Sequence, residues 1–203
     1  MWLMSVERGR RTASGVYDNK YVRLGLRDVE PPDGRRFEHH VVHLSRVAVA
    51  LIVNERDEVL MLWRYRFATD EWGYELPGGD RRRQRGVRRA VREAGEESGW
   101  QPLGEAERLV SFEPVPGMVT SQFDVYLWHG ARHIGDPTDE EEAGTIEWVP
   151  LSRVVELTQQ RRLLAPGHSW RCSTTWLQEV PDERQFKRRG TCAIEERIPD
   201  RRG

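Results

Sequence analysis

The sequence contains little cysteine and lysine and has no long apolar run. Its two cysteines, Cys172 and Cys192, cannot form a disulfide framework, which favours a reducing, cytoplasmic environment. The longest apolar stretch, residues 47–53, is far too short to span a bilayer, and the N-terminal residues do not resemble a signal peptide. We therefore expect a cytoplasmic protein with no membrane partner.

Arginine takes the place of lysine. Of 32 basic residues only two are lysine, so 30 are arginine, and they balance 33 acidic residues to a net charge of −1. This balance disfavours a protein whose whole surface binds nucleic acid. The arginines are nevertheless clustered, and residues 80–92 contain seven of them: Arg81, Arg82, Arg83, Arg85, Arg88, Arg89 and Arg92.

The apolar pattern predicts a β-rich domain with two helices, of the α/β or α+β class. We expect one strand within residues 16–29, a turn at 31–34, and further strands at 37–44, 46–53, 59–63, 72–76, 109–112, 123–128 and 145–149. One helix is expected over 87–98, with Gly99 as its C-cap, and another from Pro150 to about residue 160.

The chain is predicted to hold one domain over residues 15–164. Residues 1–14 are then an N-terminal extension. The segment 165–203 mixes basic and acidic residues without a clear period, so we expect it to be poorly ordered.

Three carboxylates in the first predicted helix carry the chemical signal. Glu93, Glu96 and Glu97 are three or four residues apart, so they share one helix face. A solvated acidic face is the usual explanation of such a cluster. Oxygen-only ligands also suit Mg²⁺ or Mn²⁺, and a Gly78–Gly79 turn before the helix allows close backbone approach to a ligand.

The surrounding residues favour the metal interpretation, because they resemble the Nudix hydrolase box. At the spacing of the box, the match covers Gly78, Arg92, Glu93, Glu96, Glu97, Gly99 and Trp100, with Ala94 at the first apolar position. The wider resemblance covers about residues 15–160. It implies an α/β/α sandwich around a mixed sheet. It also implies hydrolysis of a nucleoside diphosphate linked to another moiety.

The resemblance also implies roles for the box residues. Glu93 and Glu97 would be the main metal ligands, with Gly78 in the same site. Glu96 would bind the metal directly or through water, and it is also a candidate catalytic residue. Arg92 would brace the loop and helix. In this reaction class the metal neutralises the diphosphate and activates a water molecule.

One box position departs from the family, because Gln84 replaces a glutamate. An amide can neither bridge metals as a carboxylate nor accept a proton, so we expect weakened activity. The nearby arginine run admits three interpretations: a phosphate or nucleic-acid clamp, a solvated basic face, or the product of two compensating frameshifts. The same frameshift hypothesis applies to residues 168–178.

The segment before the box resembles that of ADP-ribose-type Nudix enzymes. Within LWRYRFATDEWGYELPGG, Arg64 and Arg66 are candidate phosphate contacts, because the guanidinium group matches phosphate geometry. Glu75 would join the metal shell or pair with Arg66. Trp72 is a candidate for stacking on a base, with core packing as the alternative.

Features after the box support the same resemblance. Pro116 follows Trp100 by sixteen residues, a spacing that marks ADP-ribose pyrophosphatases in the family, and is a candidate substrate contact. The acidic loop at 139–142 matches the place where those enzymes keep a catalytic carboxylate. Glu141 and Glu142 are therefore the candidate general bases.

The sequence thus predicts a Mg²⁺- or Mn²⁺-dependent diphosphatase of ADP-ribose or a nucleotide sugar. It would release a nucleoside monophosphate and a sugar phosphate, and by resemblance it is a possible homodimer. Two alternatives remain open: a catalytically weakened Nudix module that binds nucleotides in a regulatory role, and an RNA-associated protein that uses the arginine patch.

Overall fold

The structure is a computed structural model that describes residues 13–31, 33–80, 86–139 and 144–164. Contacts divide the chain into two compact units, 1–168 and 169–203, and every element described below belongs to the first. None of the helices in these described ranges is long and apolar enough to cross a bilayer.

The central layer is a mixed seven-stranded sheet with the order β13-β5-β4-β11-β9, in which β6 pairs with β5 and β7 pairs with β4. Its strands are β4 (Val47–Val53), β5 (Glu58–Arg66), β6 (Glu71–Glu75), β7 (Gly78–Asp80), β9 (Glu107–Phe112), β11 (Phe123–His129) and β13 (Thr145–Pro150). Among the described strand pairs of this sheet, only β4 and β11 run parallel, in register from Val47–Phe123 to Val53–His129.

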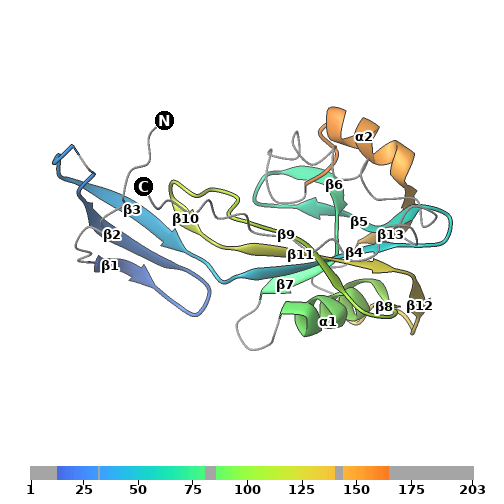
Figure 1. The fold of residues 1–203 in the computed structure, drawn as a ribbon. Helices are drawn as coiled ribbons and strands as arrows, with labels where there is room; N and C mark the ends of the chain where they lie inside the picture. Colours follow the sequence, from blue (N-terminus) through green and yellow to red (C-terminus); the bar gives the residue numbers. More distant parts are fainter. Residues whose placement is uncertain (1–12, 32, 81–85, 140–143, 165–203) are drawn as a thin grey trace, which may run out of the picture. The chain divides into compact units, whose positions relative to one another are not determined.

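Helices cover both faces of this sheet: α1 (Gly86–Ser98) lies on one and α2 (Leu151–Gln159) on the other (Figure 1). Strand β4, VAVALIV, is buried along nearly its whole length, as a strand covered on both sides must be. On the α1 side, Ala48, Ala50 and Ile52 pack with Ala90 and Ala94 of the helix. Small side chains on both partners let the helix backbone come close to the sheet.

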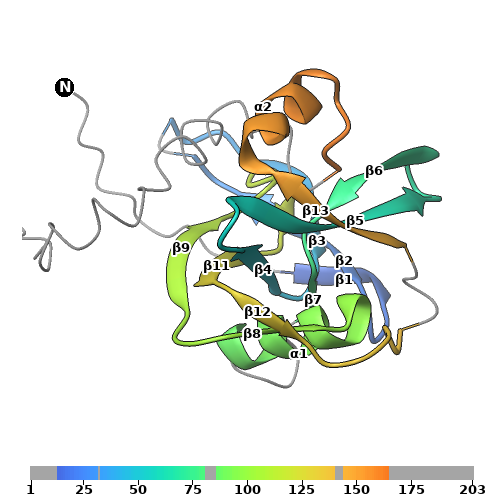
Figure 2. The ribbon, with the colours of Figure 1, turned by 90° about the vertical axis from the view of Figure 1, so that its right-hand side faces the viewer.

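A second sheet has the order β1-β2-β3-β10, formed by β1 (Ala13–Asp18), β2 (Arg23–Val29), β3 (Phe37–His43) and β10 (Val119–Thr120). β3 leads directly into β4, and β10 into β11. A two-stranded ribbon of β8 (Trp100–Pro102) and β12 (Ala131–His133) follows the end of α1 (Figure 2).

The expected fold class is confirmed, with mixed sheets and two helices, but two local predictions are wrong. The single strand expected within 16–29 is a hairpin, because the Asn19 Oδ1 atom accepts hydrogen bonds from the N–H groups of Tyr21 and Val22 and closes a turn. The expected Gly78–Gly79 turn is strand β7, which pairs with β4.

The expected C-cap is also confirmed. Gly99 follows α1 with a φ of 71°, and its N–H donates to the Gly95 carbonyl. A side chain at this position would collide with the Gly135 carbonyl, so both the backbone conformation and the available space require glycine.

Candidate active site

The buried face of α1 places two carboxylates against strand β7. Glu93 is 5% exposed and Glu97 is 3% exposed. The Gly78 N–H donates to the Glu97 Oε2 atom at 3.0 Å. Buried carboxylates are costly unless they are paired, so this placement is unusual for a surface helix and indicates a built site.

The two glycines of β7 are needed for space. Neither has a positive φ. A Cβ atom on Gly79 would lie 2.7 Å from the carboxyl carbon of Glu93, and one on Gly78 would lie 2.8 Å from the Ala48 carbonyl oxygen. Glycine therefore lets the strand backbone lie directly against the carboxylates of the helix.

The β5–β6 hairpin adds a second ionic group. Arg64 Nε lies 3.1 Å from Glu75 Oε2, and the Arg64 Nη2 atom lies 3.6 Å from Glu97 Oε2. Arg66 donates through two nitrogens to the two oxygens of Glu75, at 2.8 and 2.6 Å. Arg64 is 3% exposed, whereas about a third of the Arg66 side chain is exposed.

Arg92 connects two carboxylates along α1. Its Nη2 atom lies 3.0 Å from Glu93 Oε1, and its Nη1 atom donates to both oxygens of Glu96 at 2.7 and 2.8 Å. Glu96 is more exposed than Glu93 and Glu97 and points to the side of the helix. The three carboxylates therefore do not share one environment.

The loop that contains Glu141 and Glu142 falls partly outside the described residues, as do both candidate bases. Its described ends are at the site. Before the gap, the N–H groups of Thr138 and Asp139 donate to the Glu96 carbonyl. After it, Gly144 packs so closely on β5 that a Cβ there would lie 2.8 Å from the Trp63 carbonyl oxygen.

Two other predicted substrate contacts lie elsewhere among the described residues. Trp72 is on the face of the hairpin opposite to Arg64 and Glu75, where it stacks on Trp63 and packs at a tilt against Tyr65. Pro116 is exposed in the turn between β9 and β10. Gln84, Arg81, Arg82, Arg83 and Arg85, and the segment 165–203, lie outside the described residues.

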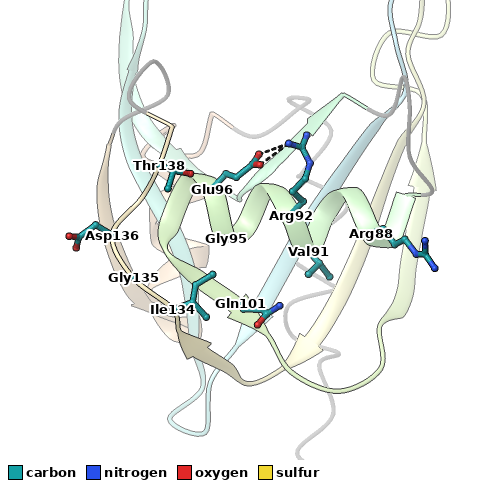
Figure 3. Close-up of a pocket in the computed structure, with 10 residues that line it drawn as sticks. All are labelled: Arg88, Val91, Arg92, Gly95, Glu96, Gln101, Ile134, Gly135, Asp136 and Thr138. Carbon is teal, nitrogen blue, oxygen red and sulfur yellow. Dashed lines mark hydrogen bonds and ion pairs between the residues drawn. The ribbon is translucent and has the colours of Figure 1, made fainter.

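A pocket of about 460 Å³ lies on the outer side of α1 (Figure 3). Arg92 and Glu96 meet on one side of the helix, whereas Val91, Ile134 and Gln101 lie on the other. Because the buried Glu93 and Glu97 do not line this pocket, it is separate from the two most enclosed carboxylates.

The donor chemistry of the site fits a hard divalent cation, because Glu93 and Glu97 offer carboxylate oxygens beside the two glycines of β7. Within the described part of the chain, however, no three acidic, histidine or cysteine side chains converge into a ready-made metal site. Guanidinium groups from Arg64, Arg89 and Arg92 contact these carboxylates instead.

Two roles in this site were not predicted from the sequence. Gly79 makes room for the Glu93 carboxylate, whereas the sequence indicated only a Gly78–Gly79 turn that a ligand could approach. Arg89 pairs with Glu93, whereas the sequence placed it only within the arginine run. Its position four residues before Glu93 on the same helix was the available signal.

The family is decided by comparison with known sequences. Residues 43–169 match the family model of the NUDIX domain, which is more than half of the chain. The chain belongs to the Nudix hydrolase family. The matched range contains the β5–β6 hairpin, β7 and α1, so Glu93 and Glu97 lie within the NUDIX domain.

Among named relatives of this Nudix hydrolase, a CMP-5'-(N-acetyl-N-hydroxy-3-aminopropyl)phosphonate hydrolase of Streptomyces rubellomurinus is 39% identical over 162 residues, or 79% of this chain and 76% of the relative. A methanol dehydrogenase activator of Bacillus methanolicus is 27% identical, over 73% of this chain and 81% of that protein. An ADP-ribose pyrophosphatase of Bacillus subtilis is 21% identical, over 79% and 88%.

The fold has a solved counterpart. The crystal structure of an ADP compounds hydrolase superposes with a TM-score of 0.64 and 16% identity, over 91% of this chain and 97% of that one. At this identity the match supports the fold alone. The sequence likeness to ADP-ribose enzymes is more distant than the likeness to the CMP-phosphonate hydrolase.

Proposed function

We propose that this Nudix hydrolase cleaves the phosphoanhydride bond that joins a nucleoside monophosphate to a second phosphoryl or phosphonyl group. The observation that carries the proposal is the pair of buried carboxylates, Glu93 and Glu97, which lie against the backbone of Gly78 and Gly79. Oxygen ligands buried against a glycine backbone are the donor set that a divalent cation of this reaction class needs.

A divalent cation bound by Glu93 and Glu97, with Glu96 beside it, would neutralise the diphosphate and activate water. The protein's own residues orient these ligands. Gly78 donates its N–H to Glu97, and Arg92 holds Glu93 and Glu96 one turn apart on α1. Arg92 is therefore a positioning residue in this proposal, because it acts through the carboxylates.

Substrate phosphate would be held by Arg66. Its guanidinium group is partly exposed and is anchored by both oxygens of Glu75, which fixes its direction. A fixed guanidinium fork suits two phosphate oxygens at once. Arg64 is too deeply buried to offer the same contact. We propose that it balances the negative charges of Glu75 and Glu97.

The proton acceptor would be Glu141 or Glu142. Glu96 is less suitable, because Arg92 engages both of its oxygens. Water would add to phosphorus, its proton would pass to the carboxylate, and the bond from phosphorus to the bridging oxygen would break. The leaving group departs as a phosphate or phosphonate anion, so no further reactant is needed.

Two substrate classes follow from different observations. The likeness to the CMP-phosphonate hydrolase supports a CMP-linked phosphonate. The ELPGG segment and Pro116 support ADP-ribose or a nucleotide sugar, as expected from the sequence. Both classes share a nucleoside monophosphate in anhydride linkage, and the experiment separates them.

The test is an activity screen on the full chain with CMP-linked phosphonates, ADP-ribose, nucleotide sugars, dinucleotides and nucleoside triphosphates. The expected result is release of a nucleoside monophosphate with Mg²⁺ or Mn²⁺, abolished by EDTA and by Glu93→Gln. Arg56→Gln is the control, because Arg56 lies in the β4–β5 turn and pairs with Glu58.

Nucleotide binding without turnover would instead support the regulatory alternative that Gln84 suggests. RNA binding that falls steeply with salt, and that is lost on substitution of Arg81, Arg82 and Arg83 by alanine, would support the RNA-associated alternative. Chromatography of the same samples tests the expected homodimer.

A further inference from the structure

The carboxylates around α1 are matched by guanidinium groups. Six ion pairs join four acidic side chains to nearby arginines: Glu75 with Arg64 and Arg66, Glu93 with Arg89 and Arg92, Glu96 with Arg92, and Glu97 with Arg64. Arg92 belongs to the family box. Arg64 and Arg89 lie outside the box pattern.

Arg64 is the most deeply buried of these cations. Its side chain is 3% exposed and that of Glu97 is 2% exposed. A guanidinium group cannot lose its proton in a protein, so a buried arginine needs a nearby negative charge. Glu75 and Glu97 supply that charge, and the buried position on β5 keeps the cation beside Glu97.

Arg89 occupies the corresponding position beside Glu93. The two residues are four apart on α1 and form a close ion pair, with about a quarter of the Arg89 side chain exposed. Helix stability does not explain this choice. A basic residue placed before its acidic partner is the less favourable order, and a cation in the first turn opposes the helix dipole. Balancing the charge of Glu93 does explain it.

A guanidinium group on a carboxylate competes with a metal ion for the same oxygens. Arg64 contacts Oε2 of Glu97, and Arg89 contacts Oε1 of Glu93. A fixed positive charge a few ångströms away also repels an incoming divalent cation, and burial reduces screening of that repulsion.

We propose that Arg64 and Arg89 are resident counter-cations, which neutralise Glu97 and Glu93 in the metal-free protein and are displaced from them when a divalent cation binds. Metal binding is therefore an exchange of cations at these two carboxylates. The proposal rests on the metal site of the proposed function, but it concerns metal affinity and not the substrate.

The competing view is that the two arginines orient the carboxylates for the metal. The two views predict opposite signs. If the arginines compete, their removal tightens metal binding and destabilises the metal-free protein. If they orient the ligands, their removal weakens metal binding.

The test is an EPR titration of Mn²⁺ against the full-length wild type, Arg89→Gln and Arg64→Gln, without substrate. Arg56→Gln removes the same charge from a surface ion pair and is the matched control. We expect Arg89→Gln to bind Mn²⁺ about tenfold more tightly, and Arg56→Gln to stay within about twofold of wild type. The metal-free melting temperature of Arg89→Gln should fall by about 3 °C.

Unchanged or weaker Mn²⁺ binding by Arg89→Gln overturns the proposal, as does the absence of binding by both wild type and variant. Arg64→Gln removes a buried cation and is the variant more prone to misfold, so Arg89→Gln alone decides. If Mn²⁺ affinity changes as expected while no nucleotide is hydrolysed, the proposed function fails and the counter-cation proposal stands.

Discussion

The two faces of the β5–β6 hairpin have opposite characters. One face carries Arg64, Arg66 and Glu75, and Arg64 on this face forms an ion pair with Glu97 of α1. The other carries four aromatic rings, in cross-strand pairs of Trp63 with Tyr74 and Tyr65 with Trp72.

Strand geometry produces this division, because successive side chains point to opposite faces. The ionic face supplies charge to the site, at the cost of burying Arg64. The aromatic face supplies packing: Trp63 stacks on Trp72, Arg162 lies over Trp63, and the Tyr74 hydroxyl donates to Glu147 of β13 at 2.7 Å. Changes on the ionic side should therefore affect turnover, and changes on the aromatic side should affect stability.

Short of removing a carboxylate, the largest effect is expected at β7, which lies against Glu93 and Glu97. Gly79→Ala places a methyl group against the carboxylate of Glu93, which must move. A displacement of about 1 Å costs on the order of a hundredfold in kcat. Gly15→Ala is the control, because open space surrounds that position. Equal kcat values for the two variants would contradict the assigned role of β7.

Trp63→Ala tests the aromatic side. The free energy of unfolding, measured by urea titration, should fall by about 2 kcal/mol, because the ring loses its contacts with Trp72, Tyr74 and Arg162. kcat/KM should stay within about threefold of wild type at a temperature where the variant is folded. A larger loss of activity without a loss of stability would break the division between the two faces.

Tyr74→Phe should have a smaller effect that depends on pH. Burial and the hydrogen bond to Glu147 raise the pKa of Tyr74 above its ordinary value of 10.0. The folded state therefore holds this proton more tightly than the unfolded state, so the contribution is fully present below pH 10 and is lost as pH rises through the raised pKa.

Removing the hydroxyl should cost about 1 kcal/mol at neutral pH. Unfolding titrations at pH 8 and above pH 10 provide the measurement. The difference between wild type and Tyr74→Phe should shrink at the higher pH, and a difference that grows would contradict the assignment.

Trp72→Ala is expected to change substrate KM least, by less than about twofold, because the ring faces away from Arg66 and Glu75. This variant also tests the sequence-based prediction that Trp72 stacks on a base. A clear rise in KM for the nucleotide, with kcat unchanged, would favour that prediction and would extend the site around the hairpin edge.

Much of the fold was predictable because local signals were strong. The continuous apolar run of β4 predicts a buried strand, and the glycine after Ser98 predicts the end of a helix. The N-terminal hairpin was missed because its turn depends on a single asparagine, Asn19, within a pattern that otherwise reads as one strand.

The candidate site was predictable where a motif fixes the spacing and unpredictable where pairing depends on the tertiary structure. The positions of Glu93 and Glu97 followed from the box. The contact of Arg64 with Glu97 joins residues 33 positions apart and depends on how β5 meets α1, which no local pattern encodes. The roles of Glu141, Glu142 and Gln84 remain predictions, because these residues lie outside the described ranges.

The central claim is that the ionic face of the hairpin and the buried side of α1 form a metal-dependent hydrolytic site. It is tested most directly by kcat of Glu97→Gln at saturating Mg²⁺, with the substrate that wild type turns over best. The account predicts a loss of about a thousandfold, with an unchanged circular dichroism spectrum. Turnover close to that of wild type in a folded Glu97→Gln protein would contradict it.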